Sequence, residues 1–200
     1  TRQDTCLLPI LLLSLQGYNE HQEKRRLLML PMPIGDLNSI AAELTETGDR
    51  VRVLWQRPES LAFVARGREY RSEFHIDPVD EVMYMIKGEM KLHYRSEDGK
   101  EDVVALKEGC SIYTAAGIPH SPRFPPNAFL LVIERQRLEG EIDRFQWFCE
   151  ECDHFLHEEQ FVVSDYRSDP VSAAYQNFFD SESYRTCNAC GHVMPNPFEN

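Results

Sequence analysis

Two histidines and one glutamate in the middle of the chain have the types and spacing of a metal site. Five residues separate His75 from Glu81, and His120 follows the turn residues Gly117 and Pro119. Two imidazoles and one carboxylate can hold a non-haem Fe(II) on one face and leave the opposite positions open for substrate and O2. If these three side chains converge, the sequence predicts an oxygen-using iron enzyme.

Strands are the elements that must position these residues. Segments rich in β-branched and aromatic residues, most of them alternating apolar with polar, cover 51–55, 61–67, 70–76, 81–86, 90–95, 102–107, 111–115 and 128–136. About eight such strands separated by turns predict an all-β jelly-roll barrel, whose strands share one interior. A short helix over 40–47 precedes them, capped by Asp36, Asn38 or Ser39 and ended by Gly48.

A second metal site is predicted after the strands, where four cysteines form two Cys-x-x-Cys pairs. They are Cys149, Cys152, Cys187 and Cys190. This pattern predicts a rubredoxin-like site of four thiolates that holds zinc or iron and clamps the C-terminal segment. His154, His157 and His192 lie close enough to substitute as ligands, although we favour solvated neighbours. Thiolates that bind a metal imply a reducing compartment, so we expect a cytoplasmic protein.

The chain divides into three predicted parts. Residues 1–32 form an N-terminal extension, whose apolar run at 6–15 is too short to span a bilayer, and a targeting role for it is the less favoured interpretation. Residues 33–140 form the barrel, and 141–200 form the metal-binding extension. Within that extension, helical spacing predicts core packing for Val171, Ala174, Tyr175, Phe178 and Phe179. The net charge of −12 argues against a nucleic-acid partner, and we expect no membrane partner.

Glycines around the first three residues add a family resemblance. With Gly88 after Glu81 and Gly109 before His120, the arrangement resembles the two motifs of the cupin superfamily. Asp77 stands where the first cupin motif has a second histidine. The departure predicts a set of two histidines and one glutamate, and a more open coordination site than in the usual cupin.

A narrower resemblance rests on five stretches taken together. They are Arg71, 120–124, 131–137, 147–152 and 187–191. In combination they resemble the 3-hydroxyanthranilate 3,4-dioxygenase family in its compact, two-metal form. The resemblance implies Fe(2+) on His75, Glu81 and His120, and substrate contacts from Arg71, Glu81, Arg123 and Glu134. Arg71 and Arg123 would hold the substrate carboxylate, and Glu134, the catalytic residue, would face its amino group.

Two site residues have a second interpretation. Glu134 lies at the end of an apolar strand, so an ion pair with Arg135 or Arg137 would also satisfy it. One residue fewer separates His120 from Arg123 than in the family pattern, which would turn the Arg123 side chain elsewhere.

The resemblance also implies a reaction. It is the ring opening of 3-hydroxyanthranilate by O2 to 2-amino-3-carboxymuconate semialdehyde, in quinolinate and NAD biosynthesis or the kynurenine pathway, by a homodimeric enzyme. Two alternatives stay open: the same chemistry on a related aminophenol or catechol acid, and a cupin that binds a metal and a small acid without turnover.

Overall fold

A computed structural model describes residues 33–163, 166 and 170–198. The chain divides into two compact units, Thr1–Ile34 and Gly35–Asn200. All described helices and strands belong to the second unit. The apolar run at 6–15, and with it the predicted extension over 1–32, lies outside the described residues. Among the described helices, none has the length and apolar character needed to cross a membrane.

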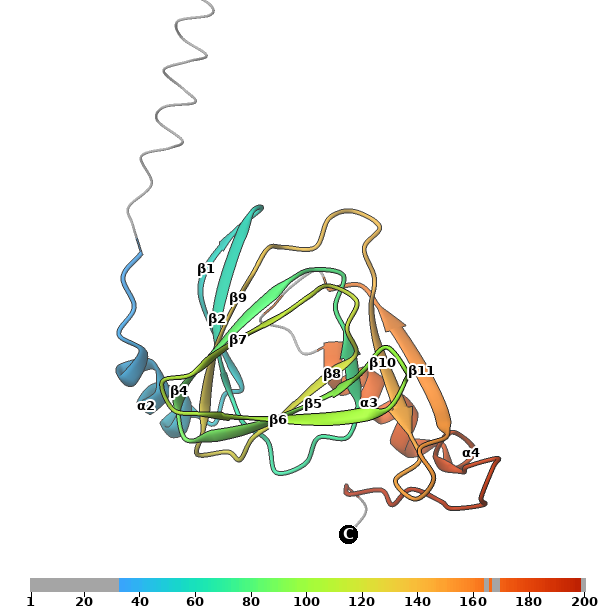
Figure 1. Cartoon of the computed structure of the whole chain (residues 1–200). Helices are drawn as coiled ribbons and strands as arrows, with labels where there is room; N and C mark the ends of the chain where they lie inside the picture. Colours follow the sequence, from blue (N-terminus) through green and yellow to red (C-terminus); the bar gives the residue numbers. More distant parts are fainter. Residues whose placement is uncertain (1–32, 164–165, 167–169, 199–200) are drawn as a thin grey trace, which may run out of the picture. The chain divides into compact units, whose positions relative to one another are not determined.

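Two antiparallel sheets form the barrel, as Figure 1 shows. The first sheet has the order β1 (Val51–Arg57), β2 (Ser60–Arg66), β9 (Phe129–Glu134), β4 (Glu81–Lys87) and β7 (Ser111–Thr114). The second has the order β11 (Phe155–Phe161), β10 (Asp143–Phe148), β3 (Phe74–Ile76), β8 (His120–Arg123), β5 (Glu89–Arg95) and β6 (Glu101–Lys107). Apolar side chains of both sheets, among them Met83, Met90, Leu92 and Leu130, fill part of the interior. The prediction of an all-β barrel is confirmed.

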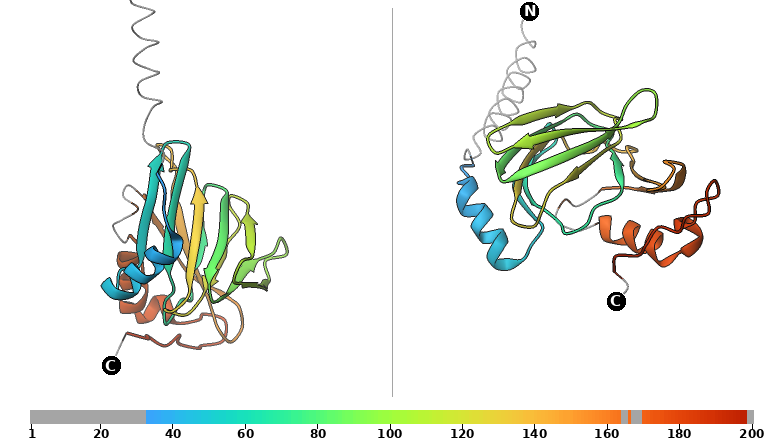
Figure 2. Two further views of the ribbon diagram at one scale, coloured as in Figure 1. Left: turned by 90° about the vertical axis from the view of Figure 1, so that its left-hand side faces the viewer. Right: turned by 60° about the horizontal axis from the view of Figure 1, so that its bottom comes forward.

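One helix covers the outside of the first sheet. Helix α2 (Leu37–Thr47) begins after Asp36, whose carboxylate accepts from the backbone of Asn38 and Ser39, and it ends at Gly48. Gly48 has a φ of 81°, a left-handed conformation that glycine adopts without strain. The helix buries Ala41 and Leu44 against the sheet (Figure 2). The predicted helix is confirmed, and it starts three residues earlier than expected.

Strands β8, β10 and β11 were not predicted. Strand β8 contains Pro122, which lacks a backbone donor, and its residues are buried on both faces, so they carry no alternation. Strand β10 does alternate, since Asp143, Phe145 and Trp147 are buried and the residues between them are partly exposed. The charged Asp143 at an inward position obscures this alternation in the sequence. β10 pairs with β3, so the segment after 141 continues the barrel's second sheet.

The C-terminal helices pack against the far part of this sheet. Helices α3 (Pro170–Asp180) and α4 (Glu182–Arg185) lie beside β11, on the side away from α2 (Figures 1 and 2). Phe178 stacks on Trp147 with ring centroids 4.3 Å apart, and Phe179 and Tyr175 join the same cluster. The predicted core packing is confirmed for these residues and Ala174. The side chain of Val171 lies outside the described residues.

Candidate metal and substrate site

The three predicted metal ligands come from both sheets. His75 on β3 pairs directly with His120 on β8, and their ring centroids are 5.6 Å apart. Glu81 opens β4, and its Oε2 lies 2.8 Å from Nε2 of His120. The turn between β3 and β4 holds this arrangement, since the Asp77 carboxylate accepts from the Val79 backbone at 2.9 Å. The folded barrel therefore brings the two sequence motifs together.

The electrostatics of these residues suit a cation. Burial would raise the pKa of Glu81, but the neighbouring His120, His75 and Arg137 lower it to about 2. Burial lowers the pKa of His75, so its ring is neutral, as a metal ligand must be. Burial also favours the neutral form of His120, but the carboxylate of Glu81 raises its pKa. Oε2 of Glu81 is buried beside Nε2 of His120, and two imidazoles with one ionised carboxylate are donors that fit a divalent metal.

Asp143 orients His75 from behind. Its Oδ2 lies 2.7 Å from Nε2 of His75, and its side chain is fully buried. Metal-binding histidines commonly give their second ring nitrogen to a carboxylate, which fixes the ring and its tautomer. Burial would raise the pKa of Asp143, but hydrogen bonds from Arg137 and His75 lower it, so it is ionised. In the sequence, Asp143 is marked only by its charge and by its inward position in the alternating pattern of β10.

Asp77 connects two groups of ligand atoms. His75, Asp77 and Asp143 have ligand atoms within 4.8 Å of one another, and so do Asp77, Glu81 and Glu134. Asp77 stands where the cupin motif has its second histidine, and we did not predict it as a site residue. Burial raises its pKa to about 9, against the effect of nearby Arg137. The Asp77 carboxyl group therefore lies close to His75 and Asp143 on one side and to Glu81 and Glu134 on the other.

Arg137 joins the carboxylates around the site. One of its terminal nitrogens lies 2.7 Å from Glu134, and the other lies 2.9 Å from Asp77 and 2.7 Å from Asp143. The ion pair considered for Glu134 is therefore present with Arg137, whereas Arg135 pairs with Glu141 at 2.6 Å. Burial raises the pKa of Glu134 to about 8, although Arg137 opposes the shift. A carboxyl group with this pKa can exchange a proton near neutral pH.

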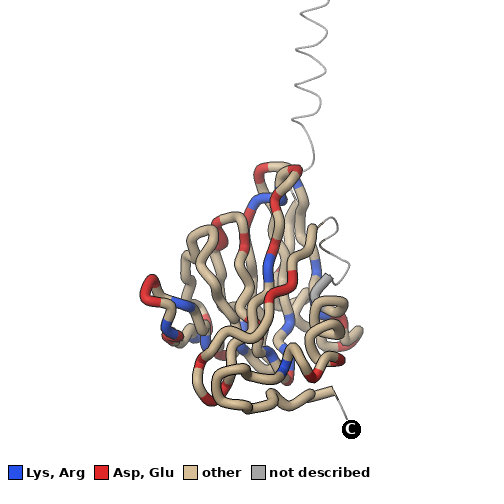
Figure 3. The backbone as a smooth tube through the Cα atoms, turned by 90° about the vertical axis from the view of Figure 1, so that its right-hand side faces the viewer, with Lys and Arg blue, Asp and Glu red and all other residues tan. Residues whose placement is uncertain are grey.

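A cavity of about 1510 Å³ opens onto the site. Its lining includes His75, Glu81, His120 and Glu134, so the proposed metal ligands and the predicted acid–base residue face one space. The volume is larger than that of a typical small-molecule pocket, so the cavity includes a wide approach as well as a binding site. Arginines also line it, at 50, 52, 66, 68, 71, 123 and 137. Carboxyl residues line it too, at 49, 69, 81, 89, 134 and 143, so a substrate anion would have to be bound by particular arginines rather than by a uniformly positive wall. Figure 3 shows acidic and basic positions interspersed along the backbone.

The two arginines predicted to bind a carboxylate have different surroundings. Nε of Arg71 lies 2.8 Å from Oε1 of Glu73, in the extended segment that leads to His75. Arg123 is the last residue of β8 and also lines the cavity. Its guanidinium lies over Phe74 at 5.6 Å, and its Nε donates to Ser121 at 3.2 Å. The role of Arg123 stays a prediction.

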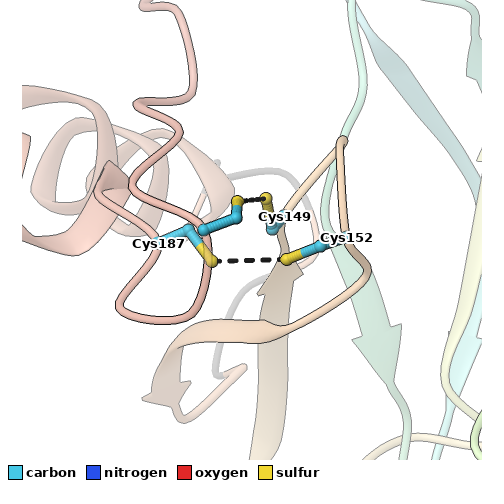
Figure 4. Close-up of side chains that lie close together, drawn as sticks. Cys149, Cys152 and Cys187 are labelled. Carbon is cyan, nitrogen blue, oxygen red and sulfur yellow. Dashed lines mark hydrogen bonds between the residues drawn. The ribbon is translucent and has the colours of Figure 1, made fainter.

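The four cysteines meet in two matching turns, as Figure 4 shows. Sγ of Cys149 lies 3.6 Å from that of Cys190, and Sγ of Cys152 lies 3.5 Å from that of Cys187. Four thiolates around one ion with bonds of about 2.3 Å would lie about 3.8 Å apart, so the cluster fits a tetrahedral metal. Among the described residues, the ligand atoms close enough to hold one ion here belong to the four cysteines. His157, a possible substitute ligand, instead pairs with Glu159 at 2.7 Å.

Comparisons with known proteins show the family of this chain. The family model described as 3-hydroxyanthranilic acid dioxygenase matches residues 52–179. A 3-hydroxyanthranilate 3,4-dioxygenase of Bacillus cereus is 41% identical over 74% of this chain and 82% of its own length. One from Shewanella woodyi is 35% identical over 90% of this chain and 84% of its own length.

Among the solved structures that match is a cupin-2 domain containing protein from Shewanella frigidimarina. It is 16% identical, covers 52% of this chain and 95% of its own, and has a TM-score of 0.41. Family membership rests on the sequence matches, which extend over most of the described barrel and part of the C-terminal segment. The chain belongs to the 3-hydroxyanthranilate 3,4-dioxygenase family, whose members are metal-dependent dioxygenases.

Proposed function

We propose that this chain opens the ring of 3-hydroxyanthranilate with O2 and forms 2-amino-3-carboxymuconate semialdehyde. The observation that supports the proposal is the contact of Glu81 with His120 and the strand pairing of His120 with His75, at a cavity that Arg71 also lines. In the reaction the ring bond beside the hydroxyl-bearing carbon breaks, and both atoms of O2 enter the product. The atoms and electrons balance without an external reductant.

His75, Glu81 and His120 would hold Fe(2+), the metal that suits two imidazoles and one carboxylate. When bound, iron supplies the electron exchange and the open positions that bring an aminophenol and O2 together. The protein's part is to keep the ligands in place. Asp143 fixes the ring of His75, and Arg137 fixes Asp143. Buried hydrogen bonds and ion pairs would therefore hold the metal ligands in position.

Arg71 would bind the carboxylate of the substrate. A guanidinium matches a planar carboxylate with two parallel hydrogen bonds, which fixes the orientation of the ring as well as its position. Glu81 and Arg123 would contribute further charge to the same pocket. Since orientation decides which ring bond meets the oxygen, Arg71 would affect both affinity and the site of cleavage.

Glu134 would act on the protons of the substrate. It is buried, has a raised pKa, and is held at one oxygen by Arg137. Accepting a hydrogen bond from the substrate amine, or the proton of its hydroxyl group, would satisfy the carboxylate within the buried site. The ion pair with Arg137 is compatible with this role, because it fixes the side chain.

The four cysteines would hold iron or zinc in a structural role. Four thiolates leave no open position on a tetrahedral ion, so this site would clamp the C-terminal segment rather than take part in the reaction. We also propose a cytoplasmic homodimer. Support comes from the thiol chemistry and from the exposed residues of the edge strand β1, and light scattering on the purified protein tests the dimer.

The test adds Fe(2+) to the purified protein without oxygen, then 3-hydroxyanthranilate, then air. We expect O2 uptake together with a new near-ultraviolet absorbance from the opened ring. O2 uptake with a related aminophenol acid, and none with 3-hydroxyanthranilate, would favour the first alternative. Tight binding of the acid without O2 uptake by the iron-loaded protein would instead favour the non-catalytic cupin.

A further inference from the structure

The carboxylate behind Arg71 connects two distant parts of the chain. Glu73 is 1% exposed, and its Oε1 lies 2.8 Å from Nε of Arg71. Its other oxygen, Oε2, accepts a hydrogen bond from the hydroxyl of Tyr175 on α3. A buried carboxylate is costly unless it is paired. Both of its oxygens are used here, so Glu73 has little freedom to move.

Tyr175 is itself held by the C-terminal segment. It is 5% exposed, and its ring contacts Trp147, Phe145 and Phe179, with centroids 6.1, 6.4 and 5.7 Å away. Helix α3 leads through α4 into the turn of Cys187. Burial raises the pKa of Tyr175 well above its usual range, and the charge of Glu73 adds to the shift, so the hydroxyl group remains a donor.

The ion pair with Glu73 restricts how Arg71 can bind an anion. Oε1 of Glu73 lies 2.8 Å from Nε without an aligned hydrogen bond, so its negative charge stands beside the side edge of the guanidinium. The edge formed by the two terminal nitrogens is then the one left for a planar carboxylate. Without a fixed partner, a long arginine side chain would lose rotamer freedom each time a ligand binds, which weakens binding.

We propose that Tyr175 is a positioning residue that acts through Glu73 to orient Arg71 toward the substrate carboxylate. The inference rests on the proposed function, because it takes Arg71 as the carboxylate-binding residue. It also gives the C-terminal segment a role beyond stability: this segment completes the anion-binding part of the barrel. A purely structural role for Tyr175 would affect all ligands equally, whereas a positioning role affects only ligands with a carboxylate.

The experiment compares Tyr175→Phe with the wild type in iron-loaded protein. Its control is Tyr184→Phe, which removes a hydroxyl group on α4 that is partly exposed and outside the Arg71 contacts. The ligands are 3-hydroxyanthranilate and 2-aminophenol, which has the same chelating groups and no carboxylate. Iron content, melting temperature, anaerobic binding and steady-state kinetics are measured for each protein.

We expect Tyr175→Phe to weaken 3-hydroxyanthranilate binding about tenfold, the effect typical of one lost hydrogen bond to a charged group. Binding of 2-aminophenol, iron content and kcat should stay within about twofold of the wild type, as should every property of Tyr184→Phe. In an Arg71→Ala background, Tyr175→Phe should have no further effect on binding, because the residue through which it acts is gone.

Equal weakening of both ligands by Tyr175→Phe would overturn the inference, as would an undiminished effect in the Arg71→Ala background. If the wild type shows the expected binding pattern but consumes no O2 with 3-hydroxyanthranilate, the proposed function fails and the positioning role stands. If the wild type binds 3-hydroxyanthranilate no better than 2-aminophenol, both proposals fail.

Discussion

Replacing Arg137 with methionine should destabilise the protein strongly. The side chain is 5% exposed and contacts the carboxyl groups of Glu134, Asp77 and Asp143 at 2.7 to 2.9 Å. Methionine keeps much of the apolar stem but leaves the buried, ionised carboxylate of Asp143 without its cation, and the other two carboxyl groups without their donor. Breaking a buried ion pair from one side typically costs about 3–5 kcal/mol. In a chain of this size each kcal/mol lowers the melting temperature by about 2–4 °C, so we expect a loss of about 6–20 °C.

The matched control is Arg135→Met, two positions earlier. Arg135 pairs with Glu141, and the two side chains are 30% and 23% exposed, respectively. Removal of this more exposed ion pair should cost about 0–1 kcal/mol and lower the melting temperature by less than about 4 °C. Thermal unfolding followed by circular dichroism on metal-free protein measures both variants. Equal shifts for Arg137→Met and Arg135→Met would refute the reasoning, because they would show that burial of the carboxylates adds nothing to the cost.

Iron retention provides a second readout for the same variant. Asp143 depends on Arg137, and His75 depends on Asp143, so Arg137→Met should bind Fe(2+) about 10–100-fold more weakly than the wild type. Iron titration below the melting temperature of the variant separates this effect from unfolding. Unchanged iron affinity in a folded Arg137→Met protein would contradict the orienting role given to Asp143.

Three further predictions concern single parts of the molecule. Arg71→Ala should raise the KM for 3-hydroxyanthranilate more than about tenfold and keep iron. Arg123→Ala should change the KM less than about threefold, because the Arg123 guanidinium already lies over Phe74 and near Glu101; equal effects of the two substitutions would contradict this difference. Cys187→Ser should make the segment after 148 sensitive to limited proteolysis at a temperature where the barrel remains folded, and resistance equal to that of the wild type would argue against a clamp. Burial raises the pKa of Glu134 to about 8, so the native state keeps a proton that the unfolded chain releases near 4.5. The free energy of unfolding of metal-free protein should therefore fall as the pH rises from about 5 toward 8, and Glu134→Gln should reduce that slope; an unchanged slope would show that Glu134 is ionised throughout.

Local patterns in the sequence were sufficient for the barrel class, the α2 caps and the four-cysteine cluster. Alternation along a strand, an Asp before a helix and a glycine after it act over a few residues, and the chain alone contains that information. The two-residue gap within each Cys-x-x-Cys pair likewise predicts a tight turn. His75, Glu81 and His120 were singled out by motif spacing, and their role as metal ligands stays a prediction.

The network behind the metal ligands was decided by tertiary structure. Asp143, Arg137 and Asp77 are ordinary charged residues in the sequence, and only the pairing of β10 with β3 places Asp143 against His75. Long-range pairing also joins Glu73 to Tyr175, 102 positions away. Buried charges must find partners, and which partner is within reach depends on how the sheets and helices pack, so no short window of residues contains the answer.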